Sequence, residues 1–353
     1  MSVPIYQLLV LPPGGTGRDR VLEDITDLIS ERLISLSIQD EAGQESDSLS
    51  LVLDDRDQQL PIPRDGTILI PRLGYRGQSL VEMGRFLVAE KSIRGPRRQL
   101  SISCTSATDE DGDAPGERLL LKDARSQSWH RTTLGEIVDT IAERHGLTAV
   151  ADPDLAGQVI EHVDQTDESD QAFLTRLADL YGAVIKPADG RLTLMIRGAA
   201  QIGPVVHLSA SDLTSWSARF QDRPRYSRVR VHYSNRIAGG EGFTTVHSPE
   251  QGFAEFVLPE LFPTLADAEA AGRAKLRSLN TSQLRVTLKG PGHPHLAAEG
   301  TVRLSGVHRL IDGEPLSIRS VRHQLGSSGY TTSIECGSRA EDTGAEEGVE
   351  GAT

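Results

Sequence analysis

The sequence predicts an α+β, mainly β protein in which two similar antiparallel β-barrel domains flank a small α/β insert. Three observations support this prediction. Short apolar runs alternate with polar residues, as in 99–104, which indicates strands with one buried face and one wet face. The same succession of runs returns in 300–336. Between these regions the apolar period changes to about 3.6 residues, which is typical of helices.

The first β region is centred on residues 66–106, where three apolar runs are separated by Gly-rich connections. This arrangement predicts consecutive antiparallel strands of a barrel or sandwich. Two earlier segments, 33–38 and 49–53, are also strand-like and extend the region toward the N-terminus. We therefore expect the first β-barrel domain over residues 1–108. The three runs are Ile68–Ile70, Phe86–Val88 and Leu100–Cys104.

The C-terminal part repeats this order of glycine, apolar runs and cysteine. Each region opens on a Gly-Thr pair and ends in a cysteine, Cys104 or Cys336, at a similar distance along the chain. The repetition predicts a second β-barrel domain over 201–338, which includes a helix over 264–279. The alternative is a chance likeness between short strands of β-branched residues. The matched segments are Gly66–Ile70 with Gly300–Leu304, Phe86–Ala89 with Leu316–Arg319, and Leu100–Cys104 with Thr332–Cys336.

An α/β insert is expected over residues 117–200. Thr133 and Glu136 match a capping box, in which two side chains satisfy exposed N–H groups at a helix start. Gly146 supplies the left-handed end of this helix. A second amphipathic helix is expected over 169–182, followed by a hairpin.

Two acidic, polar stretches limit these regions. Residues 109–117 mark the boundary between the first barrel domain and the insert. Residues 339–353 are small and acidic, which predicts a disordered tail.

The composition argues against several functional classes. With 353 residues the chain is long enough for two or three domains, and its net charge of −13 disfavours a surface that grips phosphates, so we expect no specific nucleic-acid binding. Aromatic residues make up 4% of the chain, which argues against ring-lined sugar sites. No apolar run approaches the ~18 residues of a membrane span, so we expect no stable membrane insertion. The N-terminus lacks a signal-peptide pattern, which predicts a protein kept in a cytoplasm.

Candidate metal sites have simpler explanations. The acidic run Asp54–Asp57 lies between two apolar segments and is interpreted as a turn. His293 and His295 could bind zinc, but the surrounding proline and glycines indicate an exposed loop. Cys104 and Cys336 fall on the apolar phase of their strands and are interpreted as buried thiols. We therefore expect no metal and no cofactor.

No enzyme is indicated either. His162, Asp164, Asp167 and Ser169 could be forced into a hydrolase triad, but such triads assemble from distant segments. Asp167, Glu168 and Asp170 are explained by the favourable interaction of anions with N–H groups at a helix start. Glycoside cleavage requires two carboxylates at a set distance in space. A sequence does not show that distance, so this possibility stays open. We expect no catalytic residues.

Two basic clusters, 94–98 and 219–230, interrupt strands. We interpret them as interfaces or solvated faces.

Several motifs resemble the phage late control protein D family. They cover roughly residues 30–200, and the second half agrees more loosely through Gly300 and Ile311–Gly313. The run Asp164–Asp170 with Leu174 is especially specific. Residues 1–30 and the tail have no counterpart. The other matching motifs are Leu33–Leu36, Asp47–Leu49, Leu53–Arg56, Leu60–Pro63, Gly74, Gly84, Phe86, Ser128–His130, Thr133–Ile137 and His145–Leu147.

Members of this family look like hub proteins at the centre of contractile-tail baseplates in phages, tailocins and related injection systems, and are similar to the hub domains of type VI secretion spike proteins. The resemblance implies a homotrimer in which each chain supplies two tube-like β-barrels, so that a pseudo-sixfold ring adapts a hexameric tail tube to a trimeric spike. The implied partners are the spike, the tail tube or its initiator, other baseplate proteins and the tape measure protein.

The resemblance places the protein in the tail baseplate of a virion or injection particle, assembled in the bacterial host cytoplasm. The alternatives are a carbohydrate- or cell-wall-binding module and a peptidoglycan hydrolase associated with the tail. A binding module would be a monomer with an exposed aromatic groove. A hydrolase would have a cleft with two carboxylates.

Overall fold

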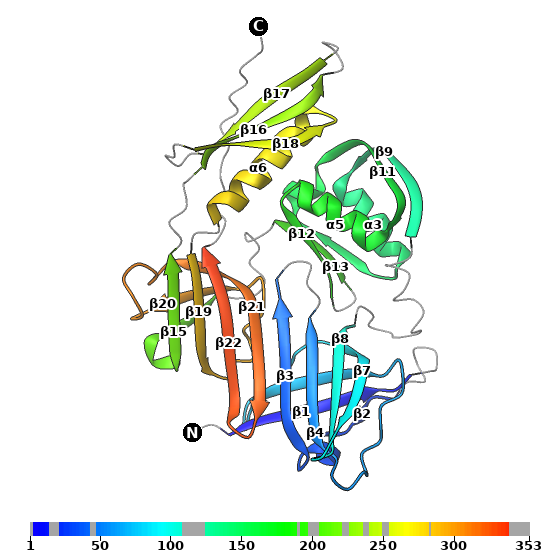
Figure 1. Cartoon of the computed structure of the whole chain (residues 1–353), viewed down its shortest axis with the longest axis vertical. Coiled ribbons are helices and arrows are strands. Elements are labelled where there is room, and N and C mark those ends of the chain that lie inside the picture. Colours follow the sequence, from blue (N-terminus) through cyan, green and yellow to red (C-terminus); the bar gives the residue numbers. More distant parts are fainter. Residues whose placement is uncertain are drawn as a thin grey trace.

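The structure is a computed structural model that describes residues 3–13, 21–42, 47–107, 124–188, 191–196, 205–220, 226–235, 240–248, 254–281 and 284–338. Within these ranges the chain is mainly β, with one sheet of 14 strands, three smaller sheets and a few helices (Figure 1). The predicted α+β, mainly β class is confirmed. None of the helices in the described ranges combines the length and apolar character that a bilayer crossing requires. The acidic stretch 109–117 and the tail 339–353 lie outside the described residues.

The first module consists of strands β1, β3, β4, β5, β7 and β8. Its strands form because apolar and polar residues alternate along them. In β4, for example, Leu49, Leu51 and Leu53 are buried, whereas Ser48 and Ser50 are exposed. The bounds are β1 Pro4–Leu11, β3 Leu33–Glu41, β4 Ser48–Asp54, β5 Ile68–Tyr75, β7 Phe86–Arg94 and β8 Gln99–Ser106, with β2 Glu23–Asp24, β6 Val81–Glu82 and helix α1 Thr26–Ile29 at the margins.

The second module consists of strands β14, β15, β19, β20, β21 and β22. It has its own apolar core, to which Val286, Leu288, Ile318, Ile334 and Cys336 contribute. The bounds are β14 Val206–Ser209, β15 Ser215–Phe220, β19 Leu284–Pro291, β20 Thr301–Ser305, β21 Pro315–Gly326 and β22 Gly329–Ser338, with the 3-10 helix η1 at Ala210–Asp212.

The two modules have the same strand order. The first runs β3-β4-β8-β7-β5-β1 and the second runs β15-β19-β22-β21-β20-β14. When the strands of each module are taken in chain order, they correspond one to one. The one difference in direction is that β1 is antiparallel to β5, whereas β14 is parallel to β20.

A β-bulge occurs at the same place in both modules. In the first, Val88 of β7 pairs with Cys104, and the bulge follows directly after Val88. In the second, Ile318 of β21 pairs with Cys336, and the bulge follows directly after Ile318. A bulge inserts one extra residue and bends the strand, so its position is a specific structural marker. It makes the two cysteines equivalent.

Backbone hydrogen bonds show that the sequence match of Gly66 with Gly300 is wrong by one residue. The Val88 N–H donates to Thr67 O, and the Ile318 N–H donates to Gly300 O, each at 2.9 Å. Gly300 therefore corresponds to Thr67 and not to Gly66. The sequence match failed here because it compared residue types, whereas the ladder compares backbone positions.

The expected closed barrels are not found. Among the described strands, the ladder of the large sheet runs in an open path from β15 to β2 and passes from one module to the other between β21 and β3. In Figure 1 these two strands, orange and blue, lie side by side at the middle of the molecule. The modules are thus two halves of one sheet within the chain.

In its described residues, the insert between the modules has three helices, of which α4 is a single short turn, and two small sheets. The predicted capping box is confirmed: the Glu136 N–H donates to Thr133 Oγ1 at 3.2 Å, and the Thr133 N–H donates back to the Glu136 carboxylate at 2.9 Å. Gly146 and Gly182 follow the helices with positive φ values. The bounds are β9 Ala124–Thr133, α3 Leu134–Arg144, β10 Thr148–Ala151, α4 Pro153–Ala156, β11 Val159–Ser169, α5 Asp170–Leu180, β12 Ala183–Ala188 and β13 Arg191–Ile196.

A further unit lies between β15 and β19. The sequence places these residues within the second barrel domain, but strands β16, β17 and β18 form a three-stranded sheet of their own that packs on helix α6 (Figure 1). The expected helix over 264–279 is confirmed as α6. The bounds are β16 Tyr226–Asn235, β17 Gly240–His247, β18 Ala254–Phe262 and α6 Leu265–Thr281.

Candidate assembly interface

The joint between the modules is a ladder of seven residue pairs between β21 and β3, from Ser320–Glu41 to Gly326–Ser35. This joint forms because β21 is long enough to pair with two strands, one on each side of its bulge. Before the bulge, residues 315–317 pair with β20, and after it, residues 320–326 pair with β3. One strand therefore belongs to both halves of the sheet.

Side chains from the second module complete the core of the first. Leu325 and Tyr330, beside the turn between β21 and β22, are buried among the apolar residues of the first module. The Tyr330 ring lies 5.9 Å from the ring of Tyr75, whose hydroxyl donates to Gly292 O at 2.8 Å. Since apolar burial and hydrogen bonds both cross the joint, the two modules are held as one body.

His323 is a buried polar residue within the joint. Its Nε2 lies 3.1 Å from Leu296 O, which can only accept, so this nitrogen carries the proton. Its Nδ1 accepts from the Tyr330 hydroxyl at 2.8 Å. Burial lowers the pKa of His323 to about 4, so the ring is neutral at pH 7.

Lys186 of β12 joins the insert to the first module. Its ammonium donates to Asp40 Oδ1 at 3.0 Å, to Asp47 Oδ1 at 3.1 Å and to Glu41 O at 3.0 Å. Burial disfavours the charged form of Lys186, but the two carboxylates outweigh burial and raise its pKa. Burial, together with the charge of Asp40, raises the pKa of Asp47 to about 6, against the opposing effect of Lys186.

Asp170 stabilises the insert from within. Its carboxylate, fully buried, accepts from Arg144 at 2.9 Å, from Gln165 at 2.8 Å and lies 2.7 Å from His145 Nε2. Burial alone would raise its pKa, but these hydrogen bonds and the Arg144 charge lower it. Asp170 lies in the first turn of α5, as the sequence predicts, and the structure adds that its carboxylate forms a buried ion pair with Arg144. Arg144 and His145 are possible partners for a carboxylate, but they lie 26 and 25 residues from Asp170, so the sequence does not show the contact.

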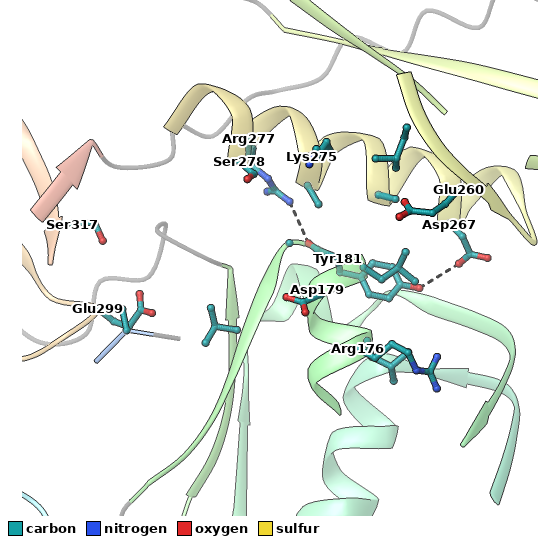
Figure 2. Close-up of a pocket in the computed structure, with 18 of the residues that line it drawn as sticks. Arg176, Asp179, Tyr181, Glu260, Asp267, Lys275, Arg277, Ser278, Glu299 and Ser317 are labelled. Atoms are coloured by element: carbon teal, nitrogen blue, oxygen red, sulfur yellow. Dashed lines mark hydrogen bonds between the residues drawn. The ribbon is translucent and has the colours of Figure 1, made fainter. Parts of the chain in front are cut away.

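A large hollow lies between the insert, α6 and the second module, with a volume of about 1360 Å³. In Figure 2, Tyr181 from the end of α5 faces α6, and Arg277 reaches its backbone. The Tyr181 hydroxyl donates to Asp267 Oδ1 at 3.5 Å, and the Arg277 guanidinium donates to Tyr181 O at 3.3 Å. These contacts dock the insert on α6.

The acidic turn is held by ion pairs, and the two loop histidines contact each other. Asp57 binds Arg32, and Asp54 binds Arg56 at 2.7 Å. The rings of His293 and His295 lie 6.0 Å apart in an edge-on arrangement. Among the described residues, no group of three or more His, Cys, Asp and Glu side chains is arranged to hold a metal ion.

The cysteines lie in different cores. Cys104 packs in the first module and Cys336 in the second, and both are buried free thiols. Burial raises the pKa of Cys104 to about 12, and it raises the pKa of Cys336 as well. Neither thiol is activated for chemistry.

Of the four residues considered for a hydrolase triad, His162 and Asp164 meet, but Ser169 and Asp167 have other partners. His162 Nε2 lies 3.2 Å from Asp164 Oδ2 and its other ring nitrogen lies 3.0 Å from His130 Nδ1. The Ser169 hydroxyl accepts from Ala172 N–H and caps α5. Asp167 pairs instead with Ser126. The serine is therefore engaged at a helix start and not at the histidine.

Comparison with known proteins supplies the decisive finding. A family model described as phage tail baseplate hub (GPD) matches residues 115–329. The chain belongs to this family. It is 32% identical to the probable baseplate hub protein of Escherichia phage 186, over 89% of this chain and 90% of that protein. The predicted resemblance is confirmed.

Two solved structures share the fold of this hub family member. A tail protein from Neisseria meningitidis MC58 is 16% identical with a TM-score of 0.65, over 96% of this chain and 97% of that one. A type VI secretion component from E. coli is 10% identical with a TM-score of 0.53, over 90% and 76%. That component is described as structurally similar to the bacteriophage T4 tail proteins gp27 and gp5.

Proposed function

We propose that this baseplate hub protein acts in a contractile tail or related injection system as a homotrimeric adapter. Each chain supplies two equivalent modules, so three chains present six around one axis. Such a pseudo-sixfold ring would match a hexameric tail tube on one face and a trimeric spike on the other. The observation that carries this proposal is the common strand order of the two modules, with a bulge at the same place in each.

A second feature supports a mechanical role. An adapter under load must keep its two modules in a fixed relation. The β3–β21 ladder, the buried Tyr330 and the contacts of Asp40 cross the boundaries between parts of the chain. We propose that the protein turns over no substrate and that these contacts hold the ring rigid.

The proposed partners follow from the role. They are the trimeric spike, the tail tube or its initiator, other baseplate proteins and the tape measure protein. The protein would reside in the tail baseplate of the particle and be assembled in the bacterial host cytoplasm. The spike would bind on the three-fold face of the ring and the tube on the six-fold face.

Mass measurement tests the proposal. We expect light scattering and native mass spectrometry of the full chain, alone and mixed with its neighbouring tail proteins, to give three copies per particle. A chain that stays monomeric in both conditions would contradict the adapter role. Glycan binding by such a monomer would favour a cell-wall-binding module, and lysis of peptidoglycan would favour a hydrolase.

A further inference from the structure

Among the described residues, the open edges of the large sheet include strand β15 and the last part of β7. Strand β15 ends the ladder and pairs only with β19. Residues 90–94 of β7 pair with β8 on one side and with no strand on the other, because β5 pairs only with Phe86 and Leu87. Figure 1 shows β15 at the left of the sheet and β7 at its right. Open edges of this kind are templates for pairing with another strand.

These two edges correspond to strands that are already paired with each other inside the chain. By strand order, β15 occupies in the second module the place that β3 occupies in the first. By the shared bulge, residues 90–94 of β7 occupy the place of residues 320–324 of β21. Because β3 pairs with β21, the first module shows how the second module's free edge can be covered.

Exposed apolar side chains mark both open edges. Ile93 on β7 is 62% exposed, and on β15 Trp216 is 43% and Phe220 is 56% exposed. At the occupied joint the residues equivalent to Trp216 and Ala218 are Leu36 and Ile38, and both are buried. The equivalent edge of the first module is covered by β21. Large exposed apolar residues on the uncovered edges therefore indicate a surface that binds a partner.

We propose that residues 91–94 of β7 in one copy pair antiparallel with residues 217–220 of β15 in a second copy, in the register of the β3–β21 joint. His323 pairs with Ile38 within the chain. The equivalent residues are Ile93 and Ala218, so these two face each other between copies. Trp216 and Phe220 are then the diagonal neighbours of Ile93 on the same face, within reach of its side chain.

This register is compatible with the remaining side chains. Lys91 falls opposite Phe220, Ser92 opposite Arg219, and Arg94 opposite Ser217, so no like charges meet directly. Gly95, which has no side chain, falls opposite Trp216. The basic clusters at 94–98 and 219–230, interpreted from the sequence as interfaces or solvated faces, thus begin at the two pairing edges.

The contact is head-to-tail, since each copy offers a β7 edge to one neighbour and a β15 edge to the other. Heterologous contacts of this kind form closed rings when the rotation closes. The inference rests on the proposed trimer for the number of copies, but it adds which strands and residues join them. In a trimer the internal joint and the contact between copies would each occur three times.

Disulfide cross-linking tests the register. The double variant Ile93→Cys, Ala218→Cys is oxidised with copper phenanthroline and run on a non-reducing gel. We expect covalent dimers and trimers, because directly opposed residues on neighbouring strands are close enough for a disulfide. The matched control is Ile93→Cys with Ser217→Cys, whose side chains point to opposite faces and are expected not to link. The wild-type chain, oxidised in the same way, shows whether the native Cys104 and Cys336 form any cross-link by themselves.

The outcomes separate this inference from the proposed function. A trimer by mass without a 93–218 cross-link, or with the 93–217 cross-link instead, would overturn the strand pairing and leave the adapter role intact. Monomers in every condition would overturn both.

A second variant tests the apolar contact. Ile93→Glu places a charge between Trp216 and Phe220, so we expect self-association to weaken at least about tenfold while the thermal unfolding of the chain is unchanged. Val159→Glu is the control, because Val159 in the insert is 60% exposed and lies on neither edge. Equal self-association of the two variants would contradict the proposal.

Discussion

Lys186 Nζ lies 3.0 Å from Asp40 Oδ1, and this contact ties the insert to the first module. The other oxygen of the same carboxylate accepts from the Ala298 N–H at 2.7 Å. Ala298 belongs to the loop before β20, so one carboxylate connects the insert and both modules. A single side chain therefore helps to fix the relative positions of three parts that are distant in the sequence.

Replacing this carboxylate is expected to loosen all three parts. Asp40→Ala leaves the Ala298 N–H without its acceptor and removes one of the two acidic partners of Lys186. We expect a loss of about 2 kcal/mol in the free energy of unfolding, below the full cost for a buried pair because the site is partly solvated. Urea unfolding measures it. Asp139→Ala, on the exposed face of α3, is the control, and equal losses would contradict this account.

The joint is expected to weaken on acidification because of His323. The unfolded ring takes up a proton near its ordinary pKa of 6.5, whereas the folded ring does so only near 4. Between these values the unfolded state binds more protons, so the contribution of His323 is complete above pH 6.5 and falls toward pH 4, by up to about 3 kcal/mol. Asp47, with its pKa raised to about 6, acts in the opposite direction over much of this range.

The variant His323→Gln isolates the histidine. Glutamine keeps a donor for Leu296 O but does not titrate, and Asp47 is present in both proteins. We expect the stability difference between the wild type and the variant to shrink as pH falls from 6.5 to 4. The measurement is urea unfolding at several pH values. Parallel pH profiles would show that His323 does not contribute.

The insert is expected to depend on Asp170. Asp170→Asn removes the buried charge that binds Arg144 and the adjacent His145, and we expect the insert to lose about 3 kcal/mol. Hydrogen exchange would then increase in α3 and α5 before it increases in the large sheet. Asp164→Asn changes a half-exposed residue of the same motif and is expected to have little effect. Equal exchange in the two variants would be evidence against the buried pair.

Gly292 is expected to tolerate no side chain. A Cβ built at this position would lie 2.0 Å from the Tyr330 ring, which is packed into the first module. We expect Gly292→Ala to lower the free energy of unfolding by about 2 kcal/mol, because the ring must move within a filled core. Gly240→Ala is the control, since nothing lies within 4 Å of its added methyl. A thermal melt compares the two, and an unchanged melting temperature in Gly292→Ala would contradict the packing argument.

The sequence alone determined the local structure of this protein and its duplicated design. Alternation along 99–104 identified a half-buried strand, and the capping box at Thr133 with Gly146 set the limits of α3. The resemblance to the baseplate hub family also rested on short motifs. These features are readable because a strand or a helix end is specified by residues close together in the chain.

Tertiary structure decided which edges meet and which charges are buried. Period-two alternation shows which face of β21 is buried, but it does not show whether β3 or another strand lies beside β21. The contact of Lys186 with Asp40 and the burial of Asp170 depend in the same way on segments that approach only in the folded chain. The open β15 edge likewise followed from the completed ladder, because strands pair through backbone groups that all residue types except proline share in full.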